Sequence, residues 1–333
     1  MARFLVRRIL LGLFTMWLAT VGTFLIFFLS GGPDTVARQI GGKLATQQVI
    51  EQIKHKMLLD RAIPIQYANF LGVMPNELSH WRGGLLQGNL GYDYYNNVPV
   101  TTVLASAFPI TLSLIVGAAI LWLVMGVLSG IVSAVKTRSL WDRSFTTLAL
   151  FFYSMPTFVL GLMLILGLYY ELTIHGVTIF PQPGYNYSFT QDPLQWARQL
   201  ILPWLTLALV SAATYTRLTR GSMLDVSGED YIRTARSKGM SERRVIFRHT
   251  LRSALTPVVT QFGIDVGTLF GGAIITEQVF QLPGLGRTSV VAIGNYDLPV
   301  VMGVVIIAAA GVIIANMLVD IGYAFLDPRV RLH

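Results

Sequence analysis

Two aspartates in apolar surroundings are the residues of this chain that could perform chemistry within a membrane. Asp265 is the only charged residue between positions 258 and 276, and Asp320 is the only one between 298 and 326. An ionisable side chain in such a stretch marks a candidate functional site, because a charge is costly to place in hydrocarbon. We expect Asp265 to hydrogen-bond neighbouring helices or shape an inner gate, and Asp320 to meet water or Arg217 and Arg220. Because each aspartate is single and no Lys, Arg or His lies in any apolar stretch, we favour gating or structural roles. A proton-coupled symporter centred on Asp265 remains an alternative.

Several kinds of enzymatic chemistry are missing from the sequence. No GxxxxGK[ST] phosphate-binding loop occurs, so we expect the chain not to hydrolyse ATP itself. It contains no cysteine, which excludes disulfides, thiolate metal sites and a cysteine nucleophile. Its five histidines show no paired metal-ligand spacing, even where His175 follows Tyr170 and Glu171. We predict that the chain is not an enzyme and has no catalytic residue, metal site or cofactor of its own.

The composition is that of a protein with many membrane-spanning helices. Hydrophobic residues make up 53% of the 333 residues and charged residues 13%, against about 25% charged in a typical soluble domain. A helix needs about twenty apolar residues to cross a bilayer. Six runs satisfy this requirement, at residues 9–29, 110–135, 144–170, 199–216, 258–276 and 298–326. The predicted fold class is therefore an all-α polytopic membrane protein with six transmembrane helices.

The distribution of basic residues predicts which side of the membrane each segment occupies. With a cytoplasmic N-terminus, seventeen Lys and Arg residues fall inside and eight outside, six of the latter in one long loop. We therefore expect both termini inside, and we attribute the pI of about 9.8 to topology and contact with lipid, not to nucleic-acid binding. The first apolar run has 21 residues, longer than the roughly 7 to 15 of a signal peptide, so we expect it to be retained.

The predicted topology places about forty polar and basic residues inside the cell between the fourth and fifth spans. We call residues 217–257 the basic insert. Its pattern predicts two short helices, at residues 230–238 and 241–251, joined by Gly239 in a left-handed conformation. Ser241 could cap the second helix, and Glu242 suits its first turn. Five basic residues would then face acidic groups of a partner or lipid phosphates: Arg233, Arg236, Lys238, Arg243 and Arg244.

The spacing within the basic insert resembles the EAA loop of ATP-binding-cassette importer permeases. Thr234 and Ala235 match its small-residue pair and Gly239 its glycine, while His249, Leu251 and Pro257 fall on its later positions. Arg252 replaces the first proline of that motif. The flanking phrases TARSKG and RHTLRSALTPVV are similar to those of the dipeptide and oligopeptide importer permeases. The resemblance extends to TEQVF at 276–280, PGLG at 283–286, NYDLP at 295–299 and the ending NMLVDIGYAFLDPR.

The segment between the first two spans also resembles the outer domain of this family. Gln66 and Tyr67 stand where the family has a Gln-Tyr pair in a helix, and residues 88–91 follow its turn phrase, with Asn89 in place of Asp. Loops of more than about 15 residues usually fold or function. We therefore divide the chain into residues 1–30 with the N-terminus and first helix, an extracytoplasmic segment at 31–109, and a five-helix permease core at 110–333 that contains the basic insert.

The resemblance implies a subunit of an importer for short peptides in the bacterial or archaeal cytoplasmic membrane. Its partners would be a second homologous permease, two ATP-binding subunits that bind ATP and Mg, an extracytoplasmic binding protein and membrane lipid, but no nucleic acid. The alternative is the same machinery importing nickel, glutathione or an oligosaccharide instead of peptides. The resemblance assigns contact with the ATP-binding subunits to Tyr231, Arg233, Thr234, Ala235, Arg236, Gly239, Arg243, Arg244, His249, Leu251 and Pro257.

Three prolines lie in or beside the predicted spans. Pro109, Pro156 and Pro203 each remove a backbone donor, which membrane helices tolerate where neighbours or water satisfy the freed carbonyl. Together with Asp265 they are candidates for a hinged pathway lining, and simple packing geometry is the alternative. The glycines at 284 and 286 are expected to permit tight turns at the outer surface, where a binding protein could dock.

Overall fold

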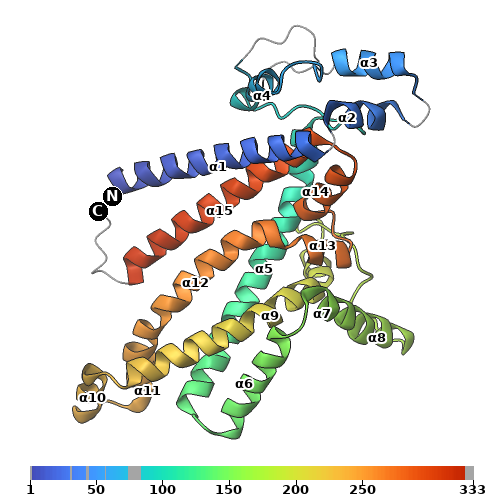
Figure 1. Cartoon of the computed structure of the whole chain (residues 1–333). Coiled ribbons are helices and arrows are strands. Elements are labelled where there is room, and N and C mark those ends of the chain that lie inside the picture. Colours follow the sequence, from blue (N-terminus) through green and yellow to red (C-terminus); the bar gives the residue numbers. More distant parts are fainter. Residues whose placement is uncertain (1, 31, 43–44, 57, 74–83, 327–333) are drawn as a thin grey trace. The chain divides into compact units, whose positions relative to one another are not determined.

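The computed structural model is helical through the residues that it describes, which are all except 1, 31, 43–44, 57, 74–83 and 327–333. Five long helices dominate (Figure 1): α1 (Ala2–Ser30), α5 (Val100–Val135), α9 (Pro193–Ser227), α12 (Leu251–Gly272) and α15 (Leu298–Leu326). The shorter ones are α2 (Gly32–Gly41), α3 (Gln47–Lys56), α4 (Ile63–Leu71), α6 (Leu140–Tyr153), α7 (Thr157–Leu164), α8 (Glu171–Ile174), α10 (Asp230–Ser237), α11 (Glu242–Arg244), α13 (Ile274–Val279) and α14 (Leu285–Gly294). Within the described residues the only β pairing is an isolated bridge between Tyr92 and Pro99, so the all-α prediction is confirmed.

Five helices of the described chain are long and apolar enough to cross a membrane. They cover Val6–Phe27, Val100–Val135, Thr157–Ile174, Pro193–Ser227 and Leu298–Leu318. Four of the predicted spans therefore lie on α1, α5, α9 and α15. The span predicted at 258–276 falls on α12, which ends at Gly272 and is not among these five.

The span predicted at 144–170 is not one continuous helix. α6 ends at Tyr153, and α7 begins at Thr157 after Pro156, which adopts an extended conformation with φ −60° and ψ 135°. Proline disfavours helical geometry in the residue before it and lacks an amide hydrogen, so the chain breaks at this point. A π-helical turn at Ile165–Tyr170 then leads into α8. The membrane-crossing segment is shifted to Thr157–Ile174.

The contacts group the residues into two compact units. The first comprises Leu112–Leu282 with Val312–His333, and the second comprises Ala2–Thr111 with Pro283–Gly311. In the second unit, Val100 and Leu104 of α5 pack against Val300, Val301 and Val304 of α15. A further apolar cluster unites Phe24 of α1 and Phe70 of α4 with Leu298 and Met302 of α15.

Small residues bring α5 and α9 into close contact within the first unit. Gly126 and Gly130 lie one turn apart on α5, and a Cβ added to Gly130 would stand 2.6 Å from the Cβ of Thr219 and 2.9 Å from the carbonyl oxygen of Thr216. Such pairs of small residues are typical of closely packed membrane helices. The Ser129 and Thr216 hydroxyls are 2.7 Å apart and share a hydrogen bond at this crossing.

We predict that Gly130→Ala lowers the thermal stability of the purified protein, whereas Gly221→Ala does not. The new methyl group must force α5 and α9 apart, which costs about 1 to 3 kcal/mol. Gly221 is the matched control, because it lies in α9 and an added Cβ would meet nothing within 4 Å. Thermal unfolding in detergent measures both variants. Equal melting temperatures for the two would contradict the close packing described here.

Candidate coupling site and pathway

The basic insert is largely helical, and its first part belongs to a long helix. α9 continues to Ser227, so Arg217 and Arg220 lie within it and not in a loop. Gly228 and Glu229 connect α9 to α10, which begins with Asp230. The helix predicted at 230–238 is thus observed at Asp230–Ser237. This arrangement places α10 directly at the end of α9.

The turn after α10 has the predicted left-handed glycine. Gly239 adopts φ +72°, and its amide donates to the carbonyl of Arg236 at 2.9 Å. The second predicted helix differs from expectation, because Ser241 occupies the N-cap position without a side-chain hydrogen bond. The short α11 then passes through a π-helical turn, Val245–Thr250, directly into α12. Leu251 therefore begins α12 and does not end a separate helix, since no glycine or proline interrupts residues 241–256.

The apolar side of α10 packs within the basic insert itself. Ile232 and Val245 are fully buried, and Ala235 is 8% exposed in the same cluster, flanked by Val226 and Met240. The two residues of the small pair, Thr234 and Ala235, therefore differ in their surroundings. Thr234 is exposed and its hydroxyl bonds the carbonyl of Asp230, whereas Ala235 allows α10 to lie close to the residues after the turn. The small residue is needed inside the insert.

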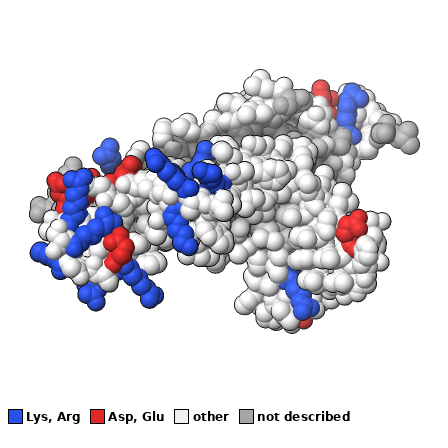
Figure 2. Space-filling view, turned by 90° about the horizontal axis from the view of Figure 1, so that it is seen from below, with Lys and Arg blue, Asp and Glu red and all other residues white. Residues whose placement is uncertain are grey.

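One of the five basic residues expected to face a partner is committed to an internal contact. Arg236 forms two hydrogen bonds to the carboxylate of Glu242, at 2.8 and 3.2 Å, across the Gly239 turn. The hydrogen bond from Arg236 lowers the pKa of Glu242, and the pair stays exposed to solvent. Arg233 lies 3.6 Å from Asp230, while Arg243 and Arg244 are exposed on α11. Figure 2 shows Lys and Arg side chains crowded on one part of the visible face, beside a large uncharged area.

The remaining residues of the predicted coupling set, Tyr231, His249, Leu251 and Pro257, have different surroundings. The Tyr231 hydroxyl donates to Ser253 Oγ at 3.1 Å and the ring is half exposed. Nε2 of His249 is buried and has no hydrogen-bond partner in the described part of the chain. Leu251 packs against the cluster of Ile131, Met223 and Ala254, and Pro257 lies inside α12.

Asp265 forms the predicted contact with a neighbouring helix. Its carboxylate accepts hydrogen bonds from the Tyr215 hydroxyl of α9 at 2.9 Å and from Gln261 Nε2 at 2.8 Å. The Tyr215 ring packs beside Trp122, whose ring also meets Phe262 edge-on. Pro109 and Pro203 lie inside α5 and α9, and Pro156 separates α6 from α7. The side chain of Asp320 lies outside the described residues.

Asp142 was not among the predicted site residues, yet its carboxylate makes polar contacts with several described residues of the first unit. Arg220, suggested as a partner of Asp320, donates from Nε and Nη2 to the two carboxylate oxygens of Asp142 at 2.8 and 3.0 Å. Arg217 lies over the Tyr153 ring, 4.8 Å from its centroid. A usable signal did exist, because Asp142 is the only acidic residue between positions 94 and 170 and stands among basic neighbours.

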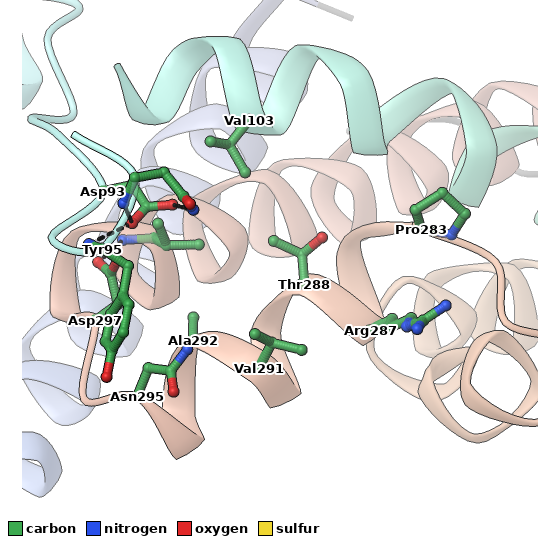
Figure 3. A pocket seen from close by; sticks show the side chains of 12 residues that line it. Asp93, Tyr95, Val103, Pro283, Arg287, Thr288, Val291, Ala292, Asn295 and Asp297 are labelled. Carbon is green, nitrogen blue, oxygen red and sulfur yellow. Dashed lines mark hydrogen bonds between the residues drawn. The ribbon is translucent and has the colours of Figure 1, made fainter. Parts of the chain in front are cut away.

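The second unit contains a pocket of about 220 Å³ beside α14, which we call the α14 pocket (Figure 3). Asp93 and Asp297 lie together at one end of it, and Arg287 and Pro283 lie away from them. Asp297 accepts hydrogen bonds from the amides of Tyr94 at 2.9 Å and Val300 at 3.3 Å, so it joins residue 94 to the start of α15. Both aspartates are buried.

Burial and contacts with neighbouring groups shift the pKa values of the two aspartates in opposite directions. Burial, followed by the hydrogen bond and charge of Asp93, raises the pKa of Asp297 to about 7. Burial also opposes ionisation of Asp93, but hydrogen bonds from Asn96 and Tyr95 outweigh it and lower the pKa of Asp93. Below about pH 7 the pair therefore holds one proton between two carboxyl groups, and it loses this proton as the pH rises through about 7.

The glycines of the PGLG phrase do not form the tight turns expected of them. Gly284 has φ −88° and ψ −176°, and Gly286 is buried within α14. Left-handed backbone occurs instead at Gln281 and Tyr296, each with φ 55°. Gly284 precedes α14 as its N-cap, so the phrase begins a helix and forms no hairpin-like turn.

Comparison with known proteins assigns the chain to a family. A model described as binding-protein-dependent transport system inner membrane component matches residues 126–332, and the model for the N-terminal part of such membrane components matches residues 1–115. The chain belongs to this family. Its members are multi-pass inner-membrane components of transport systems that work with ATP-binding and substrate-binding proteins, and they are not enzymes.

Relatives of the family cover almost the whole chain. A protein of Sinorhizobium fredii named as a peptide ABC transporter permease, y4tP, is 35% identical over 331 residues, 99% of this chain and 100% of the relative. The di/tripeptide transport system permease protein DppB of Pseudomonas aeruginosa is 36% identical over 345 residues, 99% of each chain. A peptide permease protein of Brucella suis is 37% identical over 336 residues, again 99% of each.

We predict that Gly239→Val uncouples ATP hydrolysis from the binding protein while the permease still assembles. An added Cβ meets nothing within 4 Å, so the effect is confined to the left-handed backbone, which costs a branched residue about 1 to 2 kcal/mol. Gly239→Asn should retain function, since Asn tolerates this conformation. Gly228→Ala, at φ −82° in the same insert, is the control. Wild-type stimulation of ATP hydrolysis in the Gly239→Val complex would contradict a role for this turn.

We predict that Asp297→Asn weakens the pH dependence of thermal stability between pH 4 and 7. The folded pKa of Asp297 is raised to about 7, so the folded state holds a proton that the unfolded state has released. The contribution of this group therefore falls as pH rises through this window, by at most about 1.4 kcal/mol per unit, and is constant above it. Melting temperatures at pH 5 and 8 measure the slope, with exposed Asp225→Asn as control. An unchanged slope in Asp297→Asn would exclude the shared proton.

Proposed function

We propose that this chain is a permease subunit of an ATP-driven importer of short peptides and forms half of the translocation pathway. The observation that carries the proposal is the basic insert, in which α10 and the Gly239 turn form a compact, exposed unit at the end of α9. Family membership and the peptide carriers among its relatives support it. Nickel, glutathione or oligosaccharide import by the same machinery is the alternative cargo.

The proposed assembly contains a second homologous permease, two ATP-binding subunits and an extracytoplasmic binding protein. ATP and Mg are held by the ATP-binding subunits. Both termini and the basic insert lie on the cytoplasmic side, which the excess of Lys and Arg in these segments supports. Residues 31–109 and the α14 pocket then lie on the outer side, where the binding protein docks.

Within the basic insert we assign two roles. Exposed residues meet the ATP-binding subunit: Tyr231, Arg233, Thr234, Arg243 and Arg244. The others hold these residues in position: Ala235, Arg236, Gly239, His249, Leu251 and Pro257. Asp265 braces the pathway through Tyr215, and Pro109, Pro156 and Pro203 shape the helices beside it.

A vesicle experiment separates this proposal from proton-driven symport. We expect vesicles with the complete assembly, loaded with ATP and given a labelled tripeptide and its binding protein outside, to accumulate peptide without a pH gradient. Asp265→Asn should retain uptake at a reduced level, because the amide keeps the acceptor for Tyr215. Gln261→Glu provides a control that adds an acid beside Asp265. Uptake driven by a pH gradient without ATP, and abolished in Asp265→Asn, would overturn the proposal in favour of the symporter.

A further inference from the structure

The carboxylate of Asp142 is the meeting point of three helices in the first unit. It is buried, and it accepts from Ser133 Oγ near the end of α5, from the Arg138 amide at 2.9 Å, and from Arg220 of α9 through two bonds. Thr146, one turn along α6, lies 3.5 Å from the same group. The donors therefore come from α5, from the turn before α6 and from α9.

The turn that presents Asp142 is itself constrained. Arg138 adopts φ +63°, a left-handed conformation that a residue with a side chain occupies only at a cost. Its amide is directed at Asp142 Oδ2, so the carboxylate stabilises the backbone that it caps. Ser139 in turn accepts from the Asp142 amide at the start of α6. The position of the carboxylate is therefore determined by its own turn before Arg220 binds.

Arg220 lies on α9 between the Tyr215–Asp265 contact and the start of α10. Five residues before it, Tyr215 bonds Asp265, a rise of about 7.5 Å, and ten residues after it α10 begins. Met223, three residues after Arg220, packs against Ile131 and Ala254 through apolar contacts, which carry no hydrogen bond to define an orientation. Two parallel hydrogen bonds between a guanidinium and a carboxylate specify one orientation of the helix.

We propose that Asp142 and Arg220 are positioning residues that clamp α9 to the α5–α6 turn, so that movement of α10 reaches the Tyr215–Asp265 contact and is not lost by bending at the inner end of α9. The inference rests on the proposed function and names the part of the permease that transmits motion from the basic insert. The clamp makes the inner ends of α5, α6 and α9 move as one body. Without it, α10 moves while the middle of α9 stays in place.

The first test uses Arg220→Lys in the complete transporter, with Arg217→Lys as the matched control. Lysine keeps the charge but cannot make the two-pronged contact, and at position 217 it still places a cation over Tyr153. We expect Arg220→Lys to retain assembly and basal ATP hydrolysis within twofold and to lose at least fivefold in peptide imported per ATP. Asp142→Asn should behave alike, and Arg217→Lys should resemble wild type. If Arg220→Lys lowers peptide import and ATP hydrolysis in proportion, so that the peptide imported per ATP is unchanged, the ion pair only stabilises the fold and the inference is overturned.

A second measurement follows the clamp directly. Because the chain has no cysteine, spin labels at Ser144→Cys and Asp225→Cys, both exposed, report the distance between α6 and the end of α9. We expect a narrow distance that is the same with and without ATP in the otherwise wild-type complex, and a broad or ATP-dependent one in Arg220→Lys. A narrow, unchanged distance in Arg220→Lys would overturn the clamp. A clamp that behaves as expected in a transporter without ATP-dependent uptake would instead refute the proposed function.

Discussion

A polypeptide in hydrocarbon must satisfy its backbone hydrogen bonds internally, and the rest of this structure depends on that constraint. Described segments that cross the apolar layer are therefore helices, and any movement between the two sides has to pass along helices or between their packed faces. α9 illustrates the consequence, because this single helix of 35 residues carries Tyr215, Arg220 and the connection to α10. The polar contacts of α9 determine which neighbouring helices move with it.

The first unit combines two kinds of helix contact with different mechanical properties. Where α5 crosses α9, Gly126 and Gly130 remove side-chain bulk and allow close approach. Closer to α10, Asp142 and Arg220 add a directional bond between α6 and α9. Close packing sets the distance between helices, and the ion pair sets their rotation. A permease that changes shape must keep both the distance between these helices and their relative rotation.

The two units place their acidic residues in different surroundings. Asp142 faces a guanidinium and several donors, which hold the pKa of its carboxyl group well below the usual range. Asp297 faces a second carboxyl group in a buried site, which raises its pKa to about 7. Both aspartates lie at helix starts and accept backbone amides, so the difference comes from the stronger burial of Asp297 and from the partner side chain.

The sequence by itself determined the helical fold class, four of the membrane spans, α10 and the left-handed Gly239, because apolar runs and glycine conformation act over short stretches of chain. It also pointed to Asp265 as a hydrogen-bonding acid. Only the tertiary structure decided which residues those features meet: Ala235 turned inward, Arg236 paired with Glu242, and Arg220 bound Asp142, 78 positions away. The break at Pro156 and the continuous passage from α11 into α12, by contrast, follow from local sequence, because proline interrupts a helix and no glycine or proline lies in residues 241–256. Partner choice between distant side chains leaves no periodic pattern along the chain, so it becomes visible only after the helices are assembled.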